Sequence, residues 1–579
     1  MRILLILLCA FPAVALAGVD VHVYGLGDDE ADNAYAQIGL LSYAKATDAA
    51  KAEYDPEEVQ RRFEQGVQDI RNALQPFGWY NPHITSVLHG STPDWTAIYT
   101  VDPGPPTDIA KIDIQIAGDG KDDAALQRIL KHPRLHLGQQ LNHVRYEDLK
   151  SRLMQAALAG GYLDASFSRH ELRVDPGANA AEILLTLDTG PRYYFGAVTI
   201  GQDGQLDDAF LRRYLRVTPG APFDAAQLLA TQFAFTDLGY FQSVEVEAQK
   251  SKADALRQIP VVIRTTPKKP QVYRIGAGYG TDTGARALAG VEFRRLNKQG
   301  HKLRLELRPS QNISTAIAEY RIPVGTHPGD AISFTGQGLR QNFQGISENL
   351  YSIGTAYERQ LGRWQRRYYL IYTSDDYTLK DQAAMTSVLL TPGVQFSRSE
   401  LNDPIYPRRG WFVSLDLHGA STRLLSDTDF IEGLFRLRGV YPLARGLRVL
   451  ARIEEGGALV SGFQTLPPSQ RFFAGGDDSV RGYSYQSLGP TDSMGNVIGG
   501  KYLSTGSVEL DYDVYKNYGA ALFADAGGAD DVPNVLLHYG AGVGFRYRAP
   551  FGVIAIDLAH PFDRGASPVR LHIGMRVGL

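Results

Sequence analysis

The most decisive stretch of the sequence is Val569-Arg570-Leu571-His572-Ile573-Gly574-Met575-Arg576-Val577-Gly578-Leu579, in which every second residue is apolar. The residues between them are charged, histidine or glycine, and a period of two places successive side chains on opposite faces of a β-strand. The same alternation recurs at residues 302–308 and 507–514. A soluble sandwich does not need charge so regularly on its second face, whereas a membrane barrel has lipid outside and water inside. We therefore predict a transmembrane β-barrel over residues 271–579.

The first residues have the features of a secretory signal peptide. Met1-Arg2 gives a positive start, an apolar run follows, and Ala15-Leu16-Ala17 supplies a small-residue cleavage site. We predict that residues 1–17 are removed and that the chain is exported. Cys9 is the only cysteine and lies inside this segment, so the mature chain is predicted to have no disulfide and no cysteine-bound metal.

The composition argues against some kinds of partner and of membrane segment. A formal net charge of −4 over 579 residues argues against a nucleic-acid partner. After the first residues no stretch has the roughly 18 uninterrupted apolar residues of a membrane helix. An exported chain without such helices can span a membrane only as a closed barrel. The 60 glycines and 31 tyrosines fit a barrel, which uses glycine at turns and seams and tyrosine at the membrane interfaces.

The first half of the chain repeats itself. Glycine-aromatic pairs follow a helical pattern and precede a β-prone run at intervals of about eighty residues: Gly78-Trp79, Gly161-Tyr162 and Gly239-Tyr240. A period of this length indicates a repeated small domain rather than a solenoid. We predict three α+β domains over residues 19–103, 106–189 and 191–266.

One helix of the first repeat is specified in detail. Asp55 is expected to be the N-cap, Pro56 the first helical residue and Glu58 the partner of a capping box. Apolar residues recur at helical spacing along one face: Val59, Phe63, Val67, Ile70 and Leu74. Gly78 is expected to end this segment as a C-cap.

Two motifs near the C-terminus point to an ion pair. The segment Val480-Arg481-Gly482-Tyr483 is a polar, glycine-containing loop, and Phe523-Ala524-Asp525-Ala526-Gly527 is a strand with one carboxylate among small residues, so that Phe523, Asp525 and Gly527 form the candidate wall motif. An arginine and a carboxylate form a charge-assisted, potentially bidentate pair. We hypothesise that Arg481 pairs with Asp525, and Asp557, on another predicted strand, is the alternative partner.

A third motif lies in the middle of the predicted barrel. Asn402-Asp403-Pro404 is followed by Pro407-Arg408-Arg409-Gly410-Trp411, a pattern of turn residues ahead of a strand. Asp403, Pro407, Arg409 and Gly410 are the candidate residues of this turn. A plain Pro/Gly turn is the simpler interpretation of the motif taken alone.

Together these features resemble a known family. The order strand, helices, glycine-aromatic, two strands is similar to that of a polypeptide-transport-associated (POTRA) domain. The three C-terminal motifs, in this order, resemble the outer-membrane assembly superfamily that includes BamA, TamA and the two-partner secretion transporters. The resemblance implies α+β POTRA repeats followed by a C-terminal transmembrane antiparallel β-barrel of sixteen strands, although the length would also fit fourteen or eighteen. It also implies that the arginine loop folds into the barrel and docks on the inner wall.

The two ends of the predicted barrel form a second candidate site. The first and last strands are expected to meet in a seam rich in glycine, which weakens strand pairing. Its candidate residues are Gly276, Gly278, Gly280, Gly574, Gly578 and Leu579. The glycines either relieve curvature at closure or, as the resemblance implies, form a lateral gate through which a client strand enters the lipid. Outer-membrane barrels commonly end in an aromatic residue, and Leu579 departs from that pattern.

The resemblance also implies a function. Three repeats are similar to the TamA branch, which implies an outer-membrane location in a diderm bacterium, periplasmic POTRA domains, unfolded outer-membrane clients such as autotransporters, contact with outer-membrane lipid and a TamB-like partner on the first POTRA domain. A secretion pore for a soluble exoprotein, a role in lipid transport and a passive channel are the alternatives. The sequence has no Gly-x-Ser-x-Gly elbow, His-Glu-x-x-His or phosphate loop. We therefore expect no enzymatic activity, no cofactor and no metal.

Overall fold

The computed structural model describes residues 18–50, 54–91, 94–202, 204–380, 382–563 and 569–578. The predicted signal peptide and the seam residue Leu579 lie outside these ranges. No helix in the described part of the chain has the length and apolar character needed to cross a bilayer.

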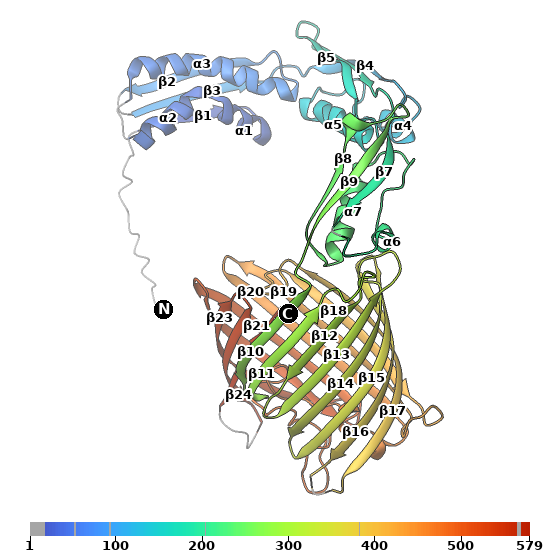
Figure 1. Ribbon diagram of the computed structural model, residues 1–579. Coiled ribbons are helices and arrows are strands. Elements are labelled where there is room, and N and C mark those ends of the chain that lie inside the picture. Colours follow the sequence, from blue (N-terminus) through green and yellow to red (C-terminus); the bar gives the residue numbers. More distant parts are fainter. Residues whose placement is uncertain are drawn as a thin grey trace, which may run out of the picture. The chain divides into compact units, whose positions relative to one another are not determined.

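The first repeat is an α+β domain built on a three-stranded sheet (Figure 1). Its elements are β1 (Val19–Tyr24), α1 (Asp28–Gln37), α2 (Gly39–Ala50), α3 (Pro56–Leu74), β2 (His83–Ser91) and β3 (Asp94–Asp102). Strand β3 is central and runs parallel to β1 and antiparallel to β2. This is the order of strand, helices and two strands that the sequence predicts.

Helix α3 begins as predicted but is capped in a different way. The Asp55 side chain accepts a hydrogen bond from the backbone N–H of Glu57 at 3.0 Å, and Pro56 is the first helical residue. The expected capping box is wrong, because the Glu58 carboxylate binds the guanidinium groups of Arg61 and Arg62 instead. Charged donors one turn further along form stronger hydrogen bonds than the neutral N–H of the cap.

The predicted apolar face of α3 packs into the core of the first repeat. Four of its five members are buried and the fifth packs against them: Val59, Phe63, Ile70, Leu74 and the partly buried Val67. The Tyr99 hydroxyl of β3 donates to the Phe63 carbonyl at 2.8 Å and ties the helix to the sheet. The helix ends at Leu74, and Gly78 terminates the short 3₁₀ turn that follows.

The second and third repeats have the same plan. Their elements are β4 (Asp108–Ala117), α4 (Ala124–Lys131), α5 (His143–Ala159), β5 (Ser166–Asp175) and β6 (Ala180–Asp188), then β7 (Tyr194–Gly201), α6 (Asp208–Arg212), α7 (Ala225–Asp237), β8 (Phe241–Ala248) and β9 (Gln258–Pro267). The sheet orders are β4-β6-β5 and β7-β9-β8, with the last strand of each repeat in the centre.

The repeated glycines have a common backbone conformation. Gly78, Gly161 and Gly239 have φ angles of 89°, 88° and 78°, a left-handed region that glycine enters without steric cost. The tyrosines that follow the second and third glycines, Tyr162 and Tyr240, are each only 2% exposed. The glycine therefore reverses the chain so that the next aromatic side chain enters the core of its repeat.

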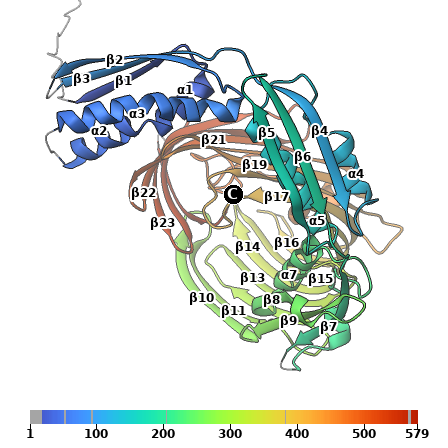
Figure 2. The ribbon, with the colours of Figure 1, turned by 90° about the horizontal axis from the view of Figure 1, so that it is seen from above.

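Within the described residues from Gln271 onward, sixteen antiparallel strands form one sheet, which confirms the barrel prediction. The strands are β10 (Gln271–Gly280), β11 (Gly284–Phe293), β12 (Lys302–Arg308), β13 (Ile313–Pro323), β14 (Ala331–Phe343), β15 (Ile346–Leu361), β16 (Trp364–Thr378), β17 (Met385–Leu401), β18 (Gly410–Ala420), β19 (Phe430–Ala444), β20 (Leu447–Val460), β21 (Tyr502–Tyr515), β22 (Tyr518–Asp530), β23 (His538–Ala549), β24 (Gly552–Pro561) and β25 (Arg570–Arg576). Each strand pairs with the next in sequence, and the sheet curves into a barrel (Figures 1 and 2).

The two faces of the sheet differ as the period of two predicts. Apolar side chains such as Ile275, Ile353 and Leu459 are 89%, 67% and 69% exposed on the outer face. Carboxylates on the inner face, such as Asp375 and Glu509, are buried. An apolar outside and a polar inside are the pattern of a barrel that spans a membrane. We call the end where β10 begins and β25 ends the proximal end, and the other the distal end.

Candidate functional site

The arginine motif lies in the long distal loop between β20 and β21, residues 461–501, which we call the lumen loop. The lumen loop has a small apolar core of its own, in which Val480 and Ala474 are fully buried against Ala458, Leu503 and Ala529 of the wall. Short backbone bridges between residues 472 and 500 and between 474 and 488 hold its two halves together. The loop is therefore a packed substructure and not an open turn.

Arg481 is the anchor of the lumen loop and is only 1% exposed. Its Nε and Nη2 donate to the two carboxylate oxygens of Asp525 at 2.7 and 2.8 Å, and its backbone N–H donates to the same carboxylate at 3.0 Å. Its Nη1 donates to Glu509 at 2.7 Å and to Asp557 at 3.0 Å. The structure thus gives Arg481 both partners that the sequence proposed as alternatives, and Glu509 in addition.

Phe523 of the wall motif also contacts Arg481. The guanidinium carbon of Arg481 lies 3.4 Å from the centre of the Phe523 ring, a cation–π contact in a shielded site. Gly527 leaves space for the neighbouring strand, since a Cβ there would lie 2.8 Å from the Ser504 carbonyl oxygen. Tyr483 reaches past Arg481 and donates its hydroxyl to the Tyr539 carbonyl at 3.2 Å.

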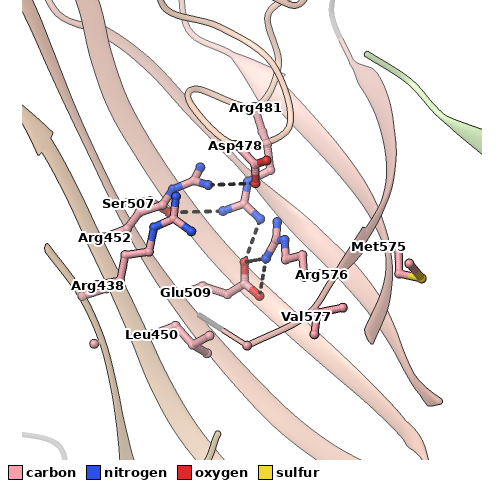
Figure 3. A pocket seen from close by; sticks show the side chains of 13 residues that line it. Arg438, Leu450, Arg452, Asp478, Arg481, Ser507, Glu509, Met575, Arg576 and Val577 are labelled. Atoms are coloured by element: carbon pink, nitrogen blue, oxygen red, sulfur yellow. Dashed lines mark hydrogen bonds and ion pairs between the residues drawn. The ribbon is translucent and has the colours of Figure 1, made fainter. Parts of the chain in front are cut away.

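The carboxylates around Arg481 are shared with two arginines of the wall. Glu509 accepts hydrogen bonds from Arg546 at 2.7 Å and lies 3.3 Å from Arg576, and Asp557 contacts the same two guanidinium groups. These residues stand on β21, β23, β24 and β25, with Asp525 on β22. Figure 3 shows the side chains of Arg481 and Arg576 meeting at Glu509. The loop cation therefore bridges the inner faces of neighbouring strands near the seam.

A small cavity lies next to this network. It measures about 250 Å³ and is lined by Arg438, Arg452, Glu509 and the last residues of the chain, from Met575 to Gly578 (Figure 3). Arg452 also holds the loop, because its Nη2 donates to the Ser479 carbonyl at 2.7 Å.

Glycines in and near the arginine motif are required by close backbone contact. Gly482 has a φ angle of 101°, and its N–H donates to Nε2 of His572 at 2.9 Å. Gly540 on β23 faces the loop backbone, and a Cβ there would lie 2.0 Å from the Arg481 carbonyl oxygen. An added side chain at Gly540 would therefore push the loop off the wall.

We expect Gly540→Ala to increase the reactivity of a buried reporter, Val480→Cys, toward a maleimide reagent. The matched control is Gly336→Ala on β14, because a Cβ at Gly336 has no neighbour within 4 Å. The labelling rate should rise in the first variant and stay at the parent value in the second. Equal rates in both variants would show that the loop does not depend on this contact.

The lumen loop also meets both strands of the seam at the distal end. Asp477 accepts a hydrogen bond from the Thr281 hydroxyl at 2.8 Å and contacts Nδ1 of His572 at 2.6 Å. Its backbone N–H donates to Asp282 at 2.8 Å. Because Nε2 of His572 accepts from Gly482, Nδ1 carries the proton and donates to Asp477. Both ring nitrogens are thus engaged in holding the loop.

Asp282 lies in the turn between β10 and β11, outside the strands. Burial, and next the nearby charge of Asp477, raise the pKa of Asp282 from 3.8 to about 6. The folded chain therefore binds a proton on Asp282 more tightly than the unfolded chain does, so the stability that the protonated carboxyl group contributes is fully present below about pH 4 and is lost as the pH rises to about 6.

We expect Asp282→Asn to raise the thermal unfolding temperature above about pH 6 and to change it little below about pH 4, with the difference growing between these two values. The amide oxygen can still accept from the Asp477 N–H, whereas the charge is gone. The measurement is the difference in unfolding temperature between the parent and the variant across this pH range. A constant difference would contradict the raised pKa.

The mid-barrel motif forms a proximal turn between β17 and β18. The Asp403 carboxylate accepts from the backbone N–H groups of Tyr406 and Ile405, each at 2.8 Å, and these donors lower its pKa. Pro407 is buried and its carbonyl accepts a hydrogen bond from Arg448. Gly410 has a φ angle of 140°, and a Cβ there would lie 2.0 Å from the Glu400 carbonyl oxygen. The Arg409 side chain is exposed.

The seam is joined at one point. In the part of the chain that the structure describes, β10 and β25 share no strand ladder. The Thr281 N–H donates to the Ile573 carbonyl at 3.1 Å, and the Ile573 N–H donates to the Thr281 hydroxyl at 3.1 Å. The two strands therefore meet at the seam, but among the described residues they do so at this point and not along their length.

The seam glycines flank this single contact. If the pairing of Thr281 with Ile573 continued as an antiparallel ladder, Gly280 would lie opposite Gly574 and Gly276 opposite Gly578. Gly276 and Gly278 are instead exposed on the free edge of β10. That edge leaves backbone N–H and C=O groups available for another strand.

Sequence reasoning missed several residues of this site. Glu509, Arg576 and His572 were visible as members of the polar face of their strands, and Arg546 has the same position on β23. Their alternation indicated that they point into the lumen. Only the register of five neighbouring strands brings them to the same point.

Comparisons with known proteins identify the domains. Residues 296–577 match the Omp85 superfamily domain. Residues 20–103 match the POTRA domain described as TamA domain 1, and residues 193–268 match a POTRA family described as the surface antigen variable number repeat.

Two curated relatives are outer membrane protein assembly factors named BamA. The chain is 23% identical over 362 residues to that of Nitratidesulfovibrio vulgaris, covering 59% of this chain and 45% of the relative. It is 21% identical over 475 residues to that of Neisseria meningitidis, covering 69% and 58%. The chain thus spans about half the length of these relatives.

A solved structure has the same fold. The crystal structure of BamA from Haemophilus ducreyi lacking POTRA domains 1–3 matches with a TM-score of 0.63 at 17% identity, over 80% of this chain and 99% of that one. A barrel domain of this family behind POTRA domains implies a barrel in an outer membrane and repeats in the periplasm. The chain thus combines a barrel domain that matches the Omp85 superfamily with segments that match POTRA domains.

Proposed function

We propose that this protein inserts β-barrel client proteins, including autotransporters, into the outer membrane of a diderm bacterium through a lateral gate between β10 and β25. The observation that carries this proposal is the exposed edge of β10, which pairs with no last strand among the described residues and is followed by a single point of contact, between Thr281 and Ile573 of β25. An extended client segment can add to such an edge through main-chain hydrogen bonds. The relatives named as assembly factors support the same activity.

The lumen loop is proposed to keep the distal end of this gate together. Arg481 binds the strands before the seam, while Asp477 contacts Thr281 on the β10 side and His572 on β25. The work is strand exchange and needs no bond-breaking chemistry, so we infer that the protein is not an enzyme and uses no cofactor.

We further propose that the protein is of the TamA type. Its three repeats and the match of the first repeat to a TamA POTRA domain support this assignment. The resemblance then implies a TamB-like inner-membrane-anchored partner on that first domain. Purified first repeat should bind such a partner, and the second repeat, residues 106–189, is the matched control.

The test of the main proposal uses the full chain in lipid vesicles with an unfolded autotransporter as client. We expect client that resists protease and migrates as a folded barrel, at a rate well above that in vesicles without the chain. Client found folded in the medium instead of the membrane would indicate a secretion pore. Lipid exchange without client insertion would indicate a lipid transport protein, and either result would overturn the proposal.

A further inference from the structure

The proximal turn of residues 402–409 is larger than a connection between two strands requires. It joins β17 and β18, the eighth and ninth of the sixteen strands in the described sheet, and so starts half the circumference away from β25. Nevertheless the Ile405 carbonyl accepts a hydrogen bond from the Gly578 N–H at 3.0 Å. The turn therefore reaches across the proximal mouth of the barrel to the end of the last strand.

Side chains of the opposite wall hold the turn in this position. The Tyr406 hydroxyl donates to Asp513 at 3.2 Å and contacts Arg548 at 3.1 Å. The guanidinium carbon of Arg448 lies 3.8 Å from the centre of the Tyr406 ring, and Arg448 also binds the Pro407 carbonyl. Arg448 is fixed in turn by Asp511, which it contacts at 2.6 Å.

These contacts are made by buried or half-buried groups, which distinguishes them from incidental surface pairs. Arg448 is 8% and Asp511 1% exposed, and Pro407 is buried. An additional ion pair, in which Arg408 is exposed, joins the turn to Asp513 at 3.2 Å. The turn is thus bound to β20, β21 and β23 at several points before it meets the last strand.

The end of the last strand leaves the barrel wall where it meets the turn. The ladder between β24 and β25 ends with Arg576 opposite Val553. Gly578 has a φ angle of 77°, and a Cβ there would lie 3.1 Å from the Pro404 carbonyl oxygen. Glycine is therefore suited to this position, because any other residue would be strained and would press on the turn.

We propose that the turn of residues 402–409 is a catch that positions the end of the last strand and keeps it away from β10. In the register set by Thr281 and Ile573, Val577 would lie opposite Ala277 and Gly578 opposite Gly276. While the catch holds Gly578, these pairs stay apart and the proximal half of the seam is open. This inference rests on the proposed gate and names the residues that regulate it.

In the test, a cysteine at position 577 can form a disulfide with a cysteine on the turn or with one on β10, and the predicted mature chain has no cysteine of its own. The full-length protein carries Ala277→Cys, Ile405→Cys and Val577→Cys, and mild oxidation followed by peptide mass spectrometry gives the ratio of the 405–577 to the 277–577 disulfide. We expect the 405–577 disulfide to predominate. Adding Tyr406→Ala, which removes the anchor, should shift the ratio toward 277–577 by about tenfold.

Further variants test whether Tyr406→Ala changes the disulfide ratio only through a local folding defect. Tyr406→Phe keeps the ring over Arg448 and loses only the hydroxyl, so its shift should be smaller. Gly578→Ala acts from the strand end and should shift the ratio in the same direction as Tyr406→Ala. Gly336→Ala is the neutral control, and heat-dependent migration in gels confirms that each barrel is folded.

The outcomes separate the catch from the proposed function. A ratio unchanged in both Tyr406→Ala and Gly578→Ala, or a parent in which 277–577 predominates, overturns the catch. The ratio needs no client, so the catch is judged without the insertion assay. A shifted ratio in a variant that inserts clients at the parent rate confirms the catch and contradicts the gate.

Discussion

Replacing Arg481 with alanine is expected to release the lumen loop while the sixteen-stranded barrel stays assembled. The arginine makes no strand-to-strand ladder contact, but it neutralises three buried carboxylates, those of Asp525, Glu509 and Asp557. Removing one partner of a buried ion pair costs about 3–5 kcal/mol, because the other charge is left without compensation. Most of this cost falls on Asp525, which keeps only a longer contact with Arg452 at 3.9 Å, whereas Glu509 and Asp557 retain Arg546 and Arg576.

The loss of the Arg481 ion pairs should weaken the docking of the lumen loop before it lowers the stability of the barrel. A free-energy change of that size raises the population of the undocked loop by about a hundredfold or more. The labelling rate of Val480→Cys should rise accordingly, since Val480 is fully buried in the docked loop. Client insertion by the variant is expected to fall to background at normal protein abundance.

Two variants give this prediction its controls. Arg481→Lys keeps the charge but loses the planar fork that serves Asp525 and Glu509 at once, so it should dock partially. Arg445→Ala removes an exposed arginine from the turn between β19 and β20 and should behave like the parent. Normal insertion by Arg481→Ala would mean that loop docking is not part of the function.

Locking the seam is expected to stop client insertion reversibly. Ala277 is exposed on β10 and Val577 directly follows β25, and the pair Ala277→Cys and Val577→Cys would be directly opposite in the register set by Thr281 and Ile573. Opposed residues of an antiparallel pair are close enough for a disulfide. Once it has formed, the β10 edge is covered, and insertion should fall to background and recover when reductant is added.

The matched control is a disulfide between strands that are already paired. Leu522→Cys and Val543→Cys face outward and lie opposite each other on β22 and β23. This disulfide should leave insertion unchanged, as should each single cysteine. Full insertion with the seam locked would exclude a lateral gate between β10 and β25.

The architecture could be predicted because its signals are local. A period of two separates the faces of a strand, and a left-handed glycine before an aromatic residue marks each repeat. Local patterns failed where a competing partner was nearby, as when Glu58 bound Arg61 and Arg62 instead of capping its helix.

The site could be predicted only in part. The motifs named Arg481 and two carboxylates, but the choice between them depended on where the strands bring their side chains, and the structure uses both. The role of residues 402–409 was not accessible in this way. Tyr406 and Gly578 are far from Asp513 and Ile405 in sequence, and nothing in a single sequence states that they meet.

The position of Arg481 in the chain sets an order of assembly. Its carboxylate partners follow it by 28 to 76 residues, and the contact of Thr281 with Asp477 spans 196. The loop is therefore synthesised before the strands that hold it, and it cannot seat until the last strands have formed. Contacts of such long sequence separation are slow to form. We expect loop docking to be the final event of the protein's own folding, so that a seated loop marks a finished barrel.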